Sequence, residues 1–239
     1  NERLTVLIYQ QSMTSVSTAG SQTDGQPLSL AQRAYDEIRR MIIRLDLAPG
    51  DVVREADLQV ALDMSRTPIR EALQRLARDH FVTVIPRRGM FVPEINVETQ
   101  LQLLELRREI ERLMVRLAAR RRTEAEHLQF AEIAAAMEEA AETSDDERFM
   151  VLDNVFNTLV GTTCRNAFAQ TSMEQWNPLS RRFWYRHHTL VGDLPRMAAL
   201  HADIAWAIVA GDEDAAARAS DLLVDYLTAF TRAALDAGH

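Results

Sequence analysis

The chain contains no lysine, so all 27 of its basic residues are arginines. The use of arginine alone is typical of a bias in genome composition. Arginine also suits bidentate hydrogen bonding to phosphates and bases. A single cysteine, Cys164, excludes an intramolecular disulfide and a metal site built from several cysteines. We therefore expect Cys164 to be a small buried side chain rather than a redox centre.

Long apolar runs are also absent. No uninterrupted apolar stretch approaches the roughly 20 residues that a membrane-spanning helix requires. The apolar run from Leu4 to Tyr9 is too short for the core of a secretory signal. We therefore expect a cytoplasmic protein without a membrane partner.

The net charge of −8 argues by itself against a nucleic-acid-binding protein. The distribution of the charge reverses that argument. Residues 29–93 hold eleven arginines and nine acidic residues, whereas residues 94–239 hold fifteen arginines and twenty-four acidic residues. A mildly basic segment joined to an acidic one is typical of a DNA-binding domain attached to a separate sensor domain.

Residues 65–76 predict a short helix with two different faces. Thr67 followed by Pro68 is a helix-start signal, because a threonine oxygen can cap free N–H groups and proline at the first helical position loses no hydrogen bond. Apolar residues at three- and four-residue steps predict one buried face, and these are Ile69, Ala72, Leu73 and Leu76. The arginines left on the outer side are Arg66, Arg70 and Arg75. Such a helix end suits the DNA major groove, but the stretch alone suits a solvated surface helix equally well.

The flanking residues favour the DNA-binding interpretation. A second helical pattern covers residues 55–62, and only residues 63–65 separate it from the first, which predicts a helix-turn-helix. Asp63 stands in the turn where a positive φ is usual, and aspartate is among the few non-glycine residues that tolerate it. A further helix is expected at 31–47, and two strands at 82–85 and 90–92 joined by a turn at 86–89. Three helices and a basic-tipped hairpin predict a winged helix-turn-helix.

The second half of the chain predicts helices almost throughout. The expected ranges are 96 or 97 to 121, 124–142, 145–164, 167–187, 196–210 and 214–237. Six helices with short connections predict an antiparallel all-α bundle, so the fold class of the chain is mainly α. We expect a flexible leader at 1–28, the winged domain at 29–93, a linker at 94–99 and the helical domain at 100–239.

Residues 29–93 resemble the DNA-binding domain of the GntR family of bacterial transcription regulators. The motifs that carry the resemblance are Leu47-x-Pro49-Gly50, Glu55-x-x-Leu58, the run from Ser65 to Leu73, and Pro86-x-Arg88-Gly89. The resemblance implies that Arg66, Thr67 and Arg70 contact an operator, and that Gly89 at the wing tip lies against the minor groove. The full predicted DNA-binding set is Ser65, Arg66, Thr67, Arg70, Arg75, Arg88 and Gly89.

Residues 100–239 resemble the FCD domain, the effector-sensing domain that defines the FadR-like subgroup of GntR regulators. The matching motifs are Leu104-x-x-Arg107-x-x-x-Glu111, Asp153-x-x-Phe156-Asn157, and His201-x-x-Ile204-x-x-Ala207-Ile208-x-x-Gly211-Asp212. The resemblance implies a site for a small organic acid or related metabolite. A guanidinium pairs well with an acid, and Arg107 is the preferred carboxylate clamp because the resemblance implies that its place in the first helix motif faces the pocket. The predicted effector-binding set is Arg107, Asp153, Asn157 and His201.

Many FCD domains hold a divalent metal through one aspartate and three histidines, and the resemblance implies an incomplete form of that site at Asp153, Asn157 and His201. Imidazoles and a carboxylate suit Zn²⁺ or Ni²⁺. Here Asn157 replaces one histidine, although its carbonyl oxygen can still bind a metal. The last histidine should fall near Leu223, which cannot bind a metal. The alternative is that Asp153 and His201 are hydrogen-bonded core residues or hold the effector directly.

Together these features predict a dimeric, ligand-responsive transcription regulator, usually a repressor, that binds a palindromic operator in double-stranded DNA. An enzyme is not expected, since the chain has neither a nucleophile constellation nor a phosphate-binding loop. The remaining alternative is a DNA-binding protein whose helical domain dimerises without a metal or without sensing anything. A cavity lined by Arg107, Asp153 and His201 would argue against that alternative, and a solid apolar core would support it.

Overall fold

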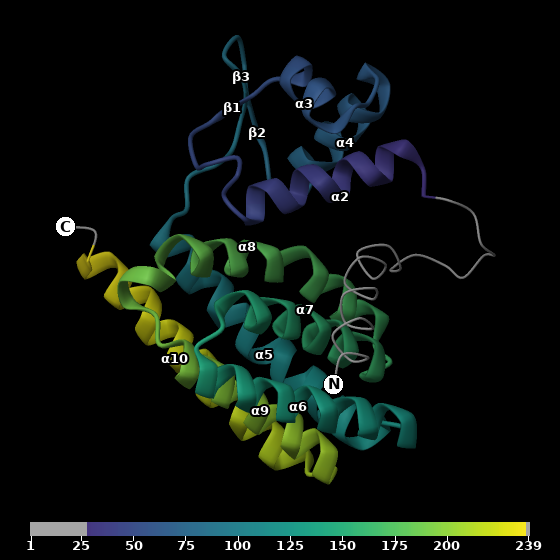
Figure 1. Cartoon of the computed structure of the whole chain (residues 1–239), viewed down its shortest axis with the longest axis vertical. Helices are drawn as coiled ribbons and strands as arrows, with labels where there is room; N and C mark the ends of the chain where they lie inside the picture. The colour runs from purple at the N-terminus through teal and green to yellow at the C-terminus, as the bar shows by residue number, and fades with distance from the viewer. Residues whose placement is uncertain (1–27, 238–239) are drawn as a thin grey trace. The chain divides into compact units, whose positions relative to one another are not determined.

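The computed structural model describes residues 28–237 (Figure 1). The leader expected at 1–28 therefore lies, except for its last residue, outside the described residues. The described chain falls into two compact units. One unit, the head, contains the residues up to Asn96 together with Asn177–Arg186. The other unit, the bundle, contains Val97–Trp176 and the residues from His187 onward.

Three helices and a small sheet make up the N-terminal part of the head. In chain order these are α2 (Leu30–Ile43), β1 (Val52–Val53), α3 (Glu55–Leu62), α4 (Arg66–Arg78), β2 (Thr83–Ile85) and β3 (Gly89–Phe91). The strands pair antiparallel in the order β1-β3-β2, and Phe91 of β3 lies opposite Thr83 on one side and Val52 on the other. The predicted winged helix-turn-helix is confirmed. Strand β1 is an addition, because two residues are too few to produce a recognisable periodicity.

The head encloses one apolar core, which explains the position of α4. Ile69, Leu73 and Leu76 of α4 are completely buried, and so are Ile38 and Ile42 of α2. Each such side chain stabilises the fold by roughly 1.5–3 kcal/mol relative to an exposed position. Val53, Phe81 and Val92 complete the core from the sheet and its flanks. Because the inner face of α4 is committed to this core, only its outer face is available to a partner.

The turn between α3 and α4 confirms one prediction from the sequence and contradicts another. Asp63 ends α3 in the left-handed region at φ 49°, as expected. The predicted helix start at Thr67 is wrong, because Ser65 is the N-cap and Thr67 and Pro68 are the second and third helical residues. The first N–H groups of a helix have no partner within the helix, so proline is tolerated throughout the first turn. A Thr-Pro pair therefore does not fix the first residue of the helix.

Six helices follow the sheet. They are α5 (Val97–Arg121), α6 (Glu124–Thr143), α7 (Asp146–Thr163), α8 (Ala167–Val191), α9 (Leu194–Ala210) and α10 (Glu213–Ala237). All six predicted helices are present, and α5 begins at Val97 as predicted. Helix α8 extends past residue 187, α9 begins two residues early, and the remaining differences at the ends of α6, α7 and α10 are one residue each. No helix among residues 28–237 is long and apolar enough to cross a bilayer.

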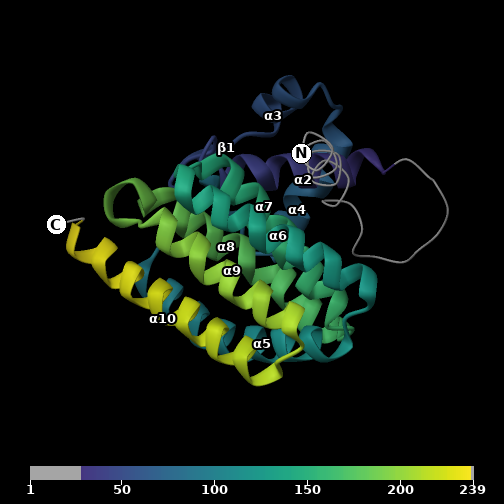
Figure 2. The ribbon, with the colours of Figure 1, turned by 60° about the horizontal axis from the view of Figure 1, so that its bottom comes forward.

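Helix α9 packs against α6 and α10, and α5 runs along α10 (Figure 2). Polar caps fix where several of these helices begin. Thr123 and Glu126 form a reciprocal capping box at α6, and the side chains of Asp145, Asn166 and Asp193 cap α7, α8 and α9. Each cap stabilises its helix by about 1 kcal/mol.

Cys164 at the end of α7 is completely buried, and its thiol donates a hydrogen bond to the Gly161 carbonyl oxygen at 3.1 Å. Burial raises the pKa of the thiol, which disfavours the reactive thiolate. The expectation of a small buried side chain is therefore confirmed.

Candidate DNA-binding face and candidate effector site

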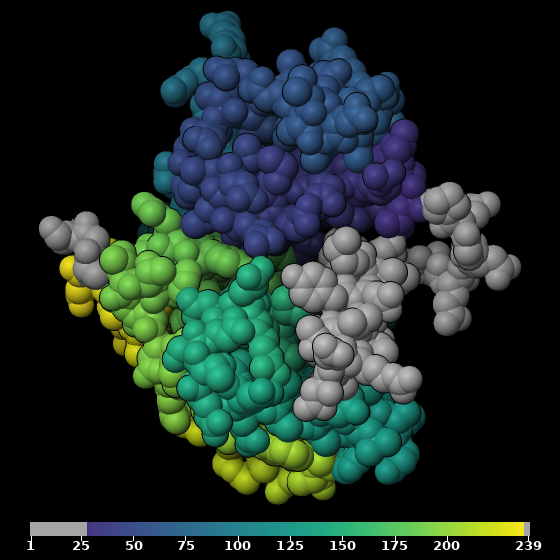
Figure 3. All heavy atoms as spheres, viewed as in Figure 1, coloured from purple at the N-terminus to yellow at the C-terminus, as the bar shows by residue number. Residues whose placement is uncertain are grey.

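The first turn of α4 is exposed to solvent on the side that faces away from the apolar core of the head. Ser65, Arg66, Thr67 and Arg70 are all exposed, and the atoms of α3 and α4, coloured blue, lie on the open surface in Figure 3. The free N–H groups at a helix N-terminus attract anions, and arginines beside them add positive charge. This end of α4 therefore has the chemistry to contact phosphates and guanine edges.

The two arginines of this turn are held differently. The Arg66 Nε atom donates to Glu55 Oε2 at 2.8 Å, yet its side chain remains 71% exposed. The ion pair with α3 positions Arg66 at the helix-turn-helix without burying it. Arg70 makes no hydrogen bond or ion pair with any residue in the described part of the chain. Its five N–H donors are therefore all available to a partner.

Arg75, which the sequence predicts to contact DNA, makes contacts within the head. Its Nη1 atom donates to Gln32 Oε1 at 2.6 Å, and its guanidinium lies 4.2 Å from the centre of the Tyr35 ring. These contacts join α4 to α2 within the head. The structure thus brings Ser65, Arg66, Thr67 and Arg70 together and occupies Arg75 with intramolecular contacts.

The wing between β2 and β3 is an exposed turn. Arg87 and Gly89 have positive φ values of 65° and 106°. A side chain at position 89 would meet no atom within 4 Å, so the backbone conformation alone makes glycine favourable there. Arg88 is exposed, with its guanidinium 5.6 Å from the centre of the Phe91 ring. Arg88 and Gly89 therefore lie at the wing tip, as the sequence predicts.

The bundle, in contrast, buries its candidate residues. Arg107 and Glu111 of α5 are 4% and 1% exposed, and Arg107 Nε lies 2.5 Å from Glu111 Oε2. Burial opposes the charge of Arg107, but Glu111 and then Asp153 outweigh burial and hold its pKa above the ordinary arginine value. Arg107 is thus a permanent cation whose closest partner is already an anion. Glu111 was not assigned a role from the sequence, although its spacing of four residues from Arg107 indicates the pair.

Asp153, Asn157 and His201 lie together in the interior, as predicted. The Asn157 Nδ2 group donates to both the backbone oxygen and Oδ1 of Asp153, each at 2.8 Å. His201 Nε2 lies 3.2 Å from the same Oδ1 atom. On the far side of the ring, His201 Nδ1 lies 2.8 Å from the Met197 carbonyl oxygen, which can only accept. Nδ1 therefore carries a proton.

Three buried polar atoms near this group form no hydrogen bond with any other of residues 28–237. They are Asn157 Oδ1, His201 Nε2 and Trp176 Nε1. The Arg107 guanidinium lies 5.8 Å from the Trp176 ring, so Trp176 belongs to the same neighbourhood.

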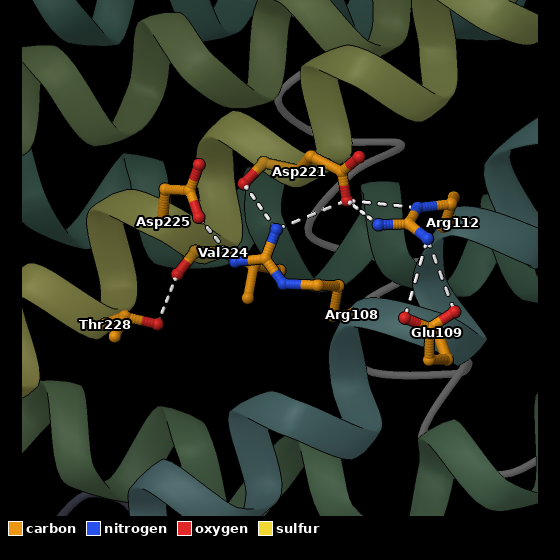
Figure 4. A network of polar contacts seen from close by, with 7 residues as sticks. All are labelled: Arg108, Glu109, Arg112, Asp221, Val224, Asp225 and Thr228. Carbon is orange, nitrogen blue, oxygen red and sulfur yellow. Dashed lines mark hydrogen bonds and ion pairs between the residues drawn. The ribbon is translucent and has the colours of Figure 1, made fainter.

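The position expected for the last metal-binding histidine is apolar and inward-facing. Leu223 of α10 is completely buried. Its acidic neighbours face away: Asp221 accepts from Arg112 Nη2 at 2.7 Å, and Asp225 pairs with Arg108 (Figure 4). These carboxylates belong to an ion-pair network between α5 and α10, and not to the interior site.

The buried residues do not fit the metal site that the resemblance implies. Among residues 28–237, no group of three histidine, cysteine or acidic side chains is placed to hold a metal ion. Asp153 and His201 are the two ionisable ligands present, whereas a protein zinc site uses three or four. The amide of Asn157 and the alkyl chain of Leu223 stand where imidazoles would be needed.

Comparisons with known proteins agree with both halves of this description. Residues 30–92 match the family described as bacterial regulatory proteins, gntR family, and residues 102–225 match the FCD domain. The chain is 31% identical over 131 residues to the Nta operon transcriptional regulator of Aminobacter aminovorans, a match that covers 55% of this chain and 62% of that protein. It is 28% identical over 194 residues to the HTH-type transcriptional repressor RspR of Escherichia coli strain K12, covering 81% and 84% of the two chains.

The solved structure of E. coli McbR/YncC has the same fold, with a TM-score of 0.76 at 20% identity over 86% of this chain and 98% of that one. The matched family and the relatives are transcription regulators and not enzymes. The exposed α4 and wing, the helical bundle and both family matches lead to one assignment: the chain belongs to the GntR family of bacterial transcription regulators, in the FadR-like subgroup that carries an FCD domain.

Proposed function

We propose that this protein is a cytoplasmic repressor that binds a palindromic DNA operator as a homodimer and releases it in response to a small metabolite held in the bundle. The observation that carries the proposal is the first turn of α4, where Arg66, Thr67 and Arg70 are exposed above a fully buried apolar face. A dimer with twofold symmetry would present two such helices to two half-sites about one helical turn apart, which explains the expected palindrome.

The proposed contact set is Ser65, Arg66, Thr67 and Arg70, with Arg88 and Gly89 at the wing. Arg75 is left out of it, because Gln32 and Tyr35 already occupy its guanidinium. An arginine that bonds a guanine edge through two hydrogens contributes about 1–3 kcal/mol of discrimination between bases. Arg70 is the strongest candidate for such a contact, since no residue in the described chain competes for it.

The metabolite-binding part of the proposal rests on the buried polar group of the bundle. A domain that served dimerisation alone would be most stable with an apolar interior, because burying charges is costly. Instead Arg107, Glu111, Asp153 and His201 are each at most 5% exposed. Effector binding at this group would change operator affinity, which is a coupling between two distinct sites.

The test begins by selecting bound duplexes from a random DNA library with the wild-type protein, since the operator is not known. We expect the selected sequences to contain two inverted half-sites. Arg70→Ala should weaken binding to the selected duplex by at least about tenfold per half-site while leaving the circular dichroism spectrum unchanged.

Arg78→Ala is the matched control, because Arg78 is also exposed on α4 but lies at its other end. The control should bind the selected duplex with nearly wild-type affinity. Equal affinities for the wild type and Arg70→Ala would refute the proposed reading face. Selected sites without twofold symmetry would refute the palindromic dimer.

A further inference from the structure

Glu55, at the start of α3, forms an ion pair with Arg66, at the start of α4. The Arg66 Nε atom donates to Glu55 Oε2 at 2.8 Å. The Glu55 side chain is only 25% exposed, whereas that of Arg66 is 71% exposed. Neither side chain makes any other hydrogen bond or ion pair with residues 28–237. A half-buried carboxylate therefore holds one specific atom of an exposed guanidinium.

The carboxylate of Glu55 has a firm support. Leu58, one helical turn further along α3, is 3% exposed and belongs to the apolar core of the head. The Met64 backbone N–H donates to the Gln59 carbonyl oxygen at 3.2 Å, which fixes the turn that leads into α4. The free N–H groups in the first turn of a helix also stabilise a carboxylate there. Glu55 is therefore the anchored member of the pair, and the long Arg66 side chain is the member that it orients.

The ion pair uses one edge of the Arg66 guanidinium and leaves the other edge available. Nε carries a single hydrogen, and Glu55 accepts it. The other four N–H groups, on Nη1 and Nη2, form no hydrogen bond within the part of the chain that the structure describes. One N–H from each of these two nitrogens forms a pair of donors at the tip of the side chain. Such a pair matches the O6 and N7 acceptors on the major-groove edge of guanine.

A carboxylate on a DNA-binding face is unfavourable by itself, because it repels phosphates. The pair formed by Glu55 and Arg66 has no net charge, so it contributes little to the attraction that all DNA sequences share. The carboxylate can instead contribute orientation, since an arginine that is already held loses less conformational freedom on binding. Arg70 has no partner among residues 28–237 and loses that freedom in full. The pairing of Arg66 therefore favours selective contact with a base over general attraction to phosphates.

We propose that Glu55 is a positioning residue for sequence recognition, which holds Arg66 so that Nη1 and Nη2 contact O6 and N7 of one guanine in each half-site. Glu55 itself touches no base and acts through Arg66. This role rests on the proposed function, because it determines specificity within the same DNA-binding face. It adds to the proposed contact set a residue of α3 whose charge is opposite to that of a DNA-binding side chain.

The test measures the affinity of the full chain for the selected duplex and for duplexes in which each base pair is replaced in turn, in both half-sites. Arg66→Ala identifies the base pair that Arg66 reads, because discrimination is lost at that pair and kept at the others. We expect a G·C pair that the wild type prefers by about 5- to 150-fold per half-site. In Glu55→Ala this preference should fall by about 2- to 12-fold, while the preferences at the other base pairs stay unchanged.

Asp57→Ala is the matched control. Asp57 is also an acidic residue in the first turn of α3, but it pairs with Arg54 at 3.7 Å and not with Arg66. The control should keep the wild-type preference, although it loses the same charge. Affinity for an unrelated duplex should not fall in either variant, since each loses a negative charge.

Two conservative variants separate positioning from folding. Glu55→Gln should keep more of the guanine preference than Glu55→Ala, because its amide oxygen can still accept from Arg66 Nε. Glu55→Asp keeps the charge at the start of α3 but draws the carboxylate back by one methylene group, so it should lose the preference as Glu55→Ala does. If Glu55→Ala does not fold, the comparison of Glu55→Asp with the wild type decides.

The double variant Arg66→Ala/Glu55→Ala shows whether Glu55 acts through Arg66, and it should discriminate between bases as Arg66→Ala does. A further loss of discrimination in the double variant overturns the proposal, and so does a wild-type guanine preference in both Glu55→Ala and Glu55→Asp. Equal loss of affinity for every duplex in Arg66→Ala also overturns it, because Arg66 would then contact phosphates alone. These outcomes leave Arg70-dependent binding intact and refute only the role of Glu55, whereas a wild type without sequence preference refutes the proposed function as well.

Discussion

The head and the bundle place their candidate functional side chains in opposite environments. In the head, Arg66, Thr67 and Arg70 lie on an exposed helix end and have few intramolecular partners. The interior of the head consists of apolar side chains. The bundle encloses Arg107, Glu111, Asp153 and His201 among helices. A partner as large as a DNA duplex needs an accessible surface, whereas a small ligand is recognised best where water is excluded. Substitutions of these exposed residues of the head should therefore change binding alone, and substitutions in the bundle interior should also change stability.

The largest effect is expected from breaking the buried ion pair. Glu111→Ala removes the closest anionic partner of the Arg107 guanidinium, which is 4% exposed, and this should lower the free energy of unfolding by about 3–5 kcal/mol. Unfolding in urea, followed by tryptophan fluorescence, measures this, because all three tryptophans lie in α8 and α9. Glu109→Ala, an exposed acidic residue on the same helix, should change the same quantity by less than about 0.5 kcal/mol. Similar losses of unfolding free energy in both variants would contradict the proposed difference between buried and exposed charges.

A smaller effect is expected from the polar cluster at the start of α6. Glu126 accepts hydrogen bonds from the Thr123 backbone at 2.7 Å and from Arg165 Nη2 at 2.8 Å. Burial opposes the ionised form, but Arg165 and then Thr123 outweigh it and lower the pKa of Glu126 from 4.5 to about 2. A lowered folded-state pKa means that this stabilisation is complete above about pH 4.5 and is lost as the pH falls toward 2.

Glu126→Gln should therefore destabilise the protein by about 1 kcal/mol at neutral pH, a value already reduced for solvent screening. The difference from the wild type should shrink steadily between pH 4.5 and 2. Thermal unfolding of both proteins across this range measures it. If the difference in stability between the wild type and Glu126→Gln stays constant with pH, the ionised carboxylate of Glu126 does not cause that difference.

The smallest effect is expected from the surface network between α5 and α10. Asp221 accepts from Arg112 Nη2 at 2.7 Å, and Arg116 and Arg120 continue the series toward Asp214 and Glu213 (Figure 4 shows the first part). Asp221→Asn should cost no more than about 1 kcal/mol, and the cost should fall at high salt, since exposed pairs are screened. A loss of stability that persists in high salt would mean that Asp221 behaves like the buried charges of the interior.

Most of the head follows from its sequence, because short-range signals determine it. The apolar spacing from Ile69 to Leu76 gives the buried face of α4, and Asp63 gives the left-handed turn residue. The start of α4 was missed, since the first turn tolerates proline at several positions. The intramolecular role of Arg75 was missed because its partners, Gln32 and Tyr35, lie more than forty residues away in sequence.

The interior of the bundle is harder to predict from the sequence. The helices and the meeting of Asp153, Asn157 and His201 were predicted, because the motifs that carry these residues resemble a known domain. Which hydrogen bonds are made and which atoms are left without a partner depends on side-chain orientation across α5, α7 and α9. The pairing of Arg107 with Glu111 is a consequence of that orientation.

The most direct test of the division between the two regions measures DNA binding and stability in one variant. Arg70→Ala is titrated with the selected DNA duplex, and its unfolding in urea is compared with that of the wild type. The account predicts that DNA affinity falls by at least about tenfold while the free energy of unfolding changes by less than about 0.5 kcal/mol. Unchanged DNA affinity, or a loss of affinity that is accompanied by a large loss of stability, would contradict an exposed reading face that is separate from the packed interior.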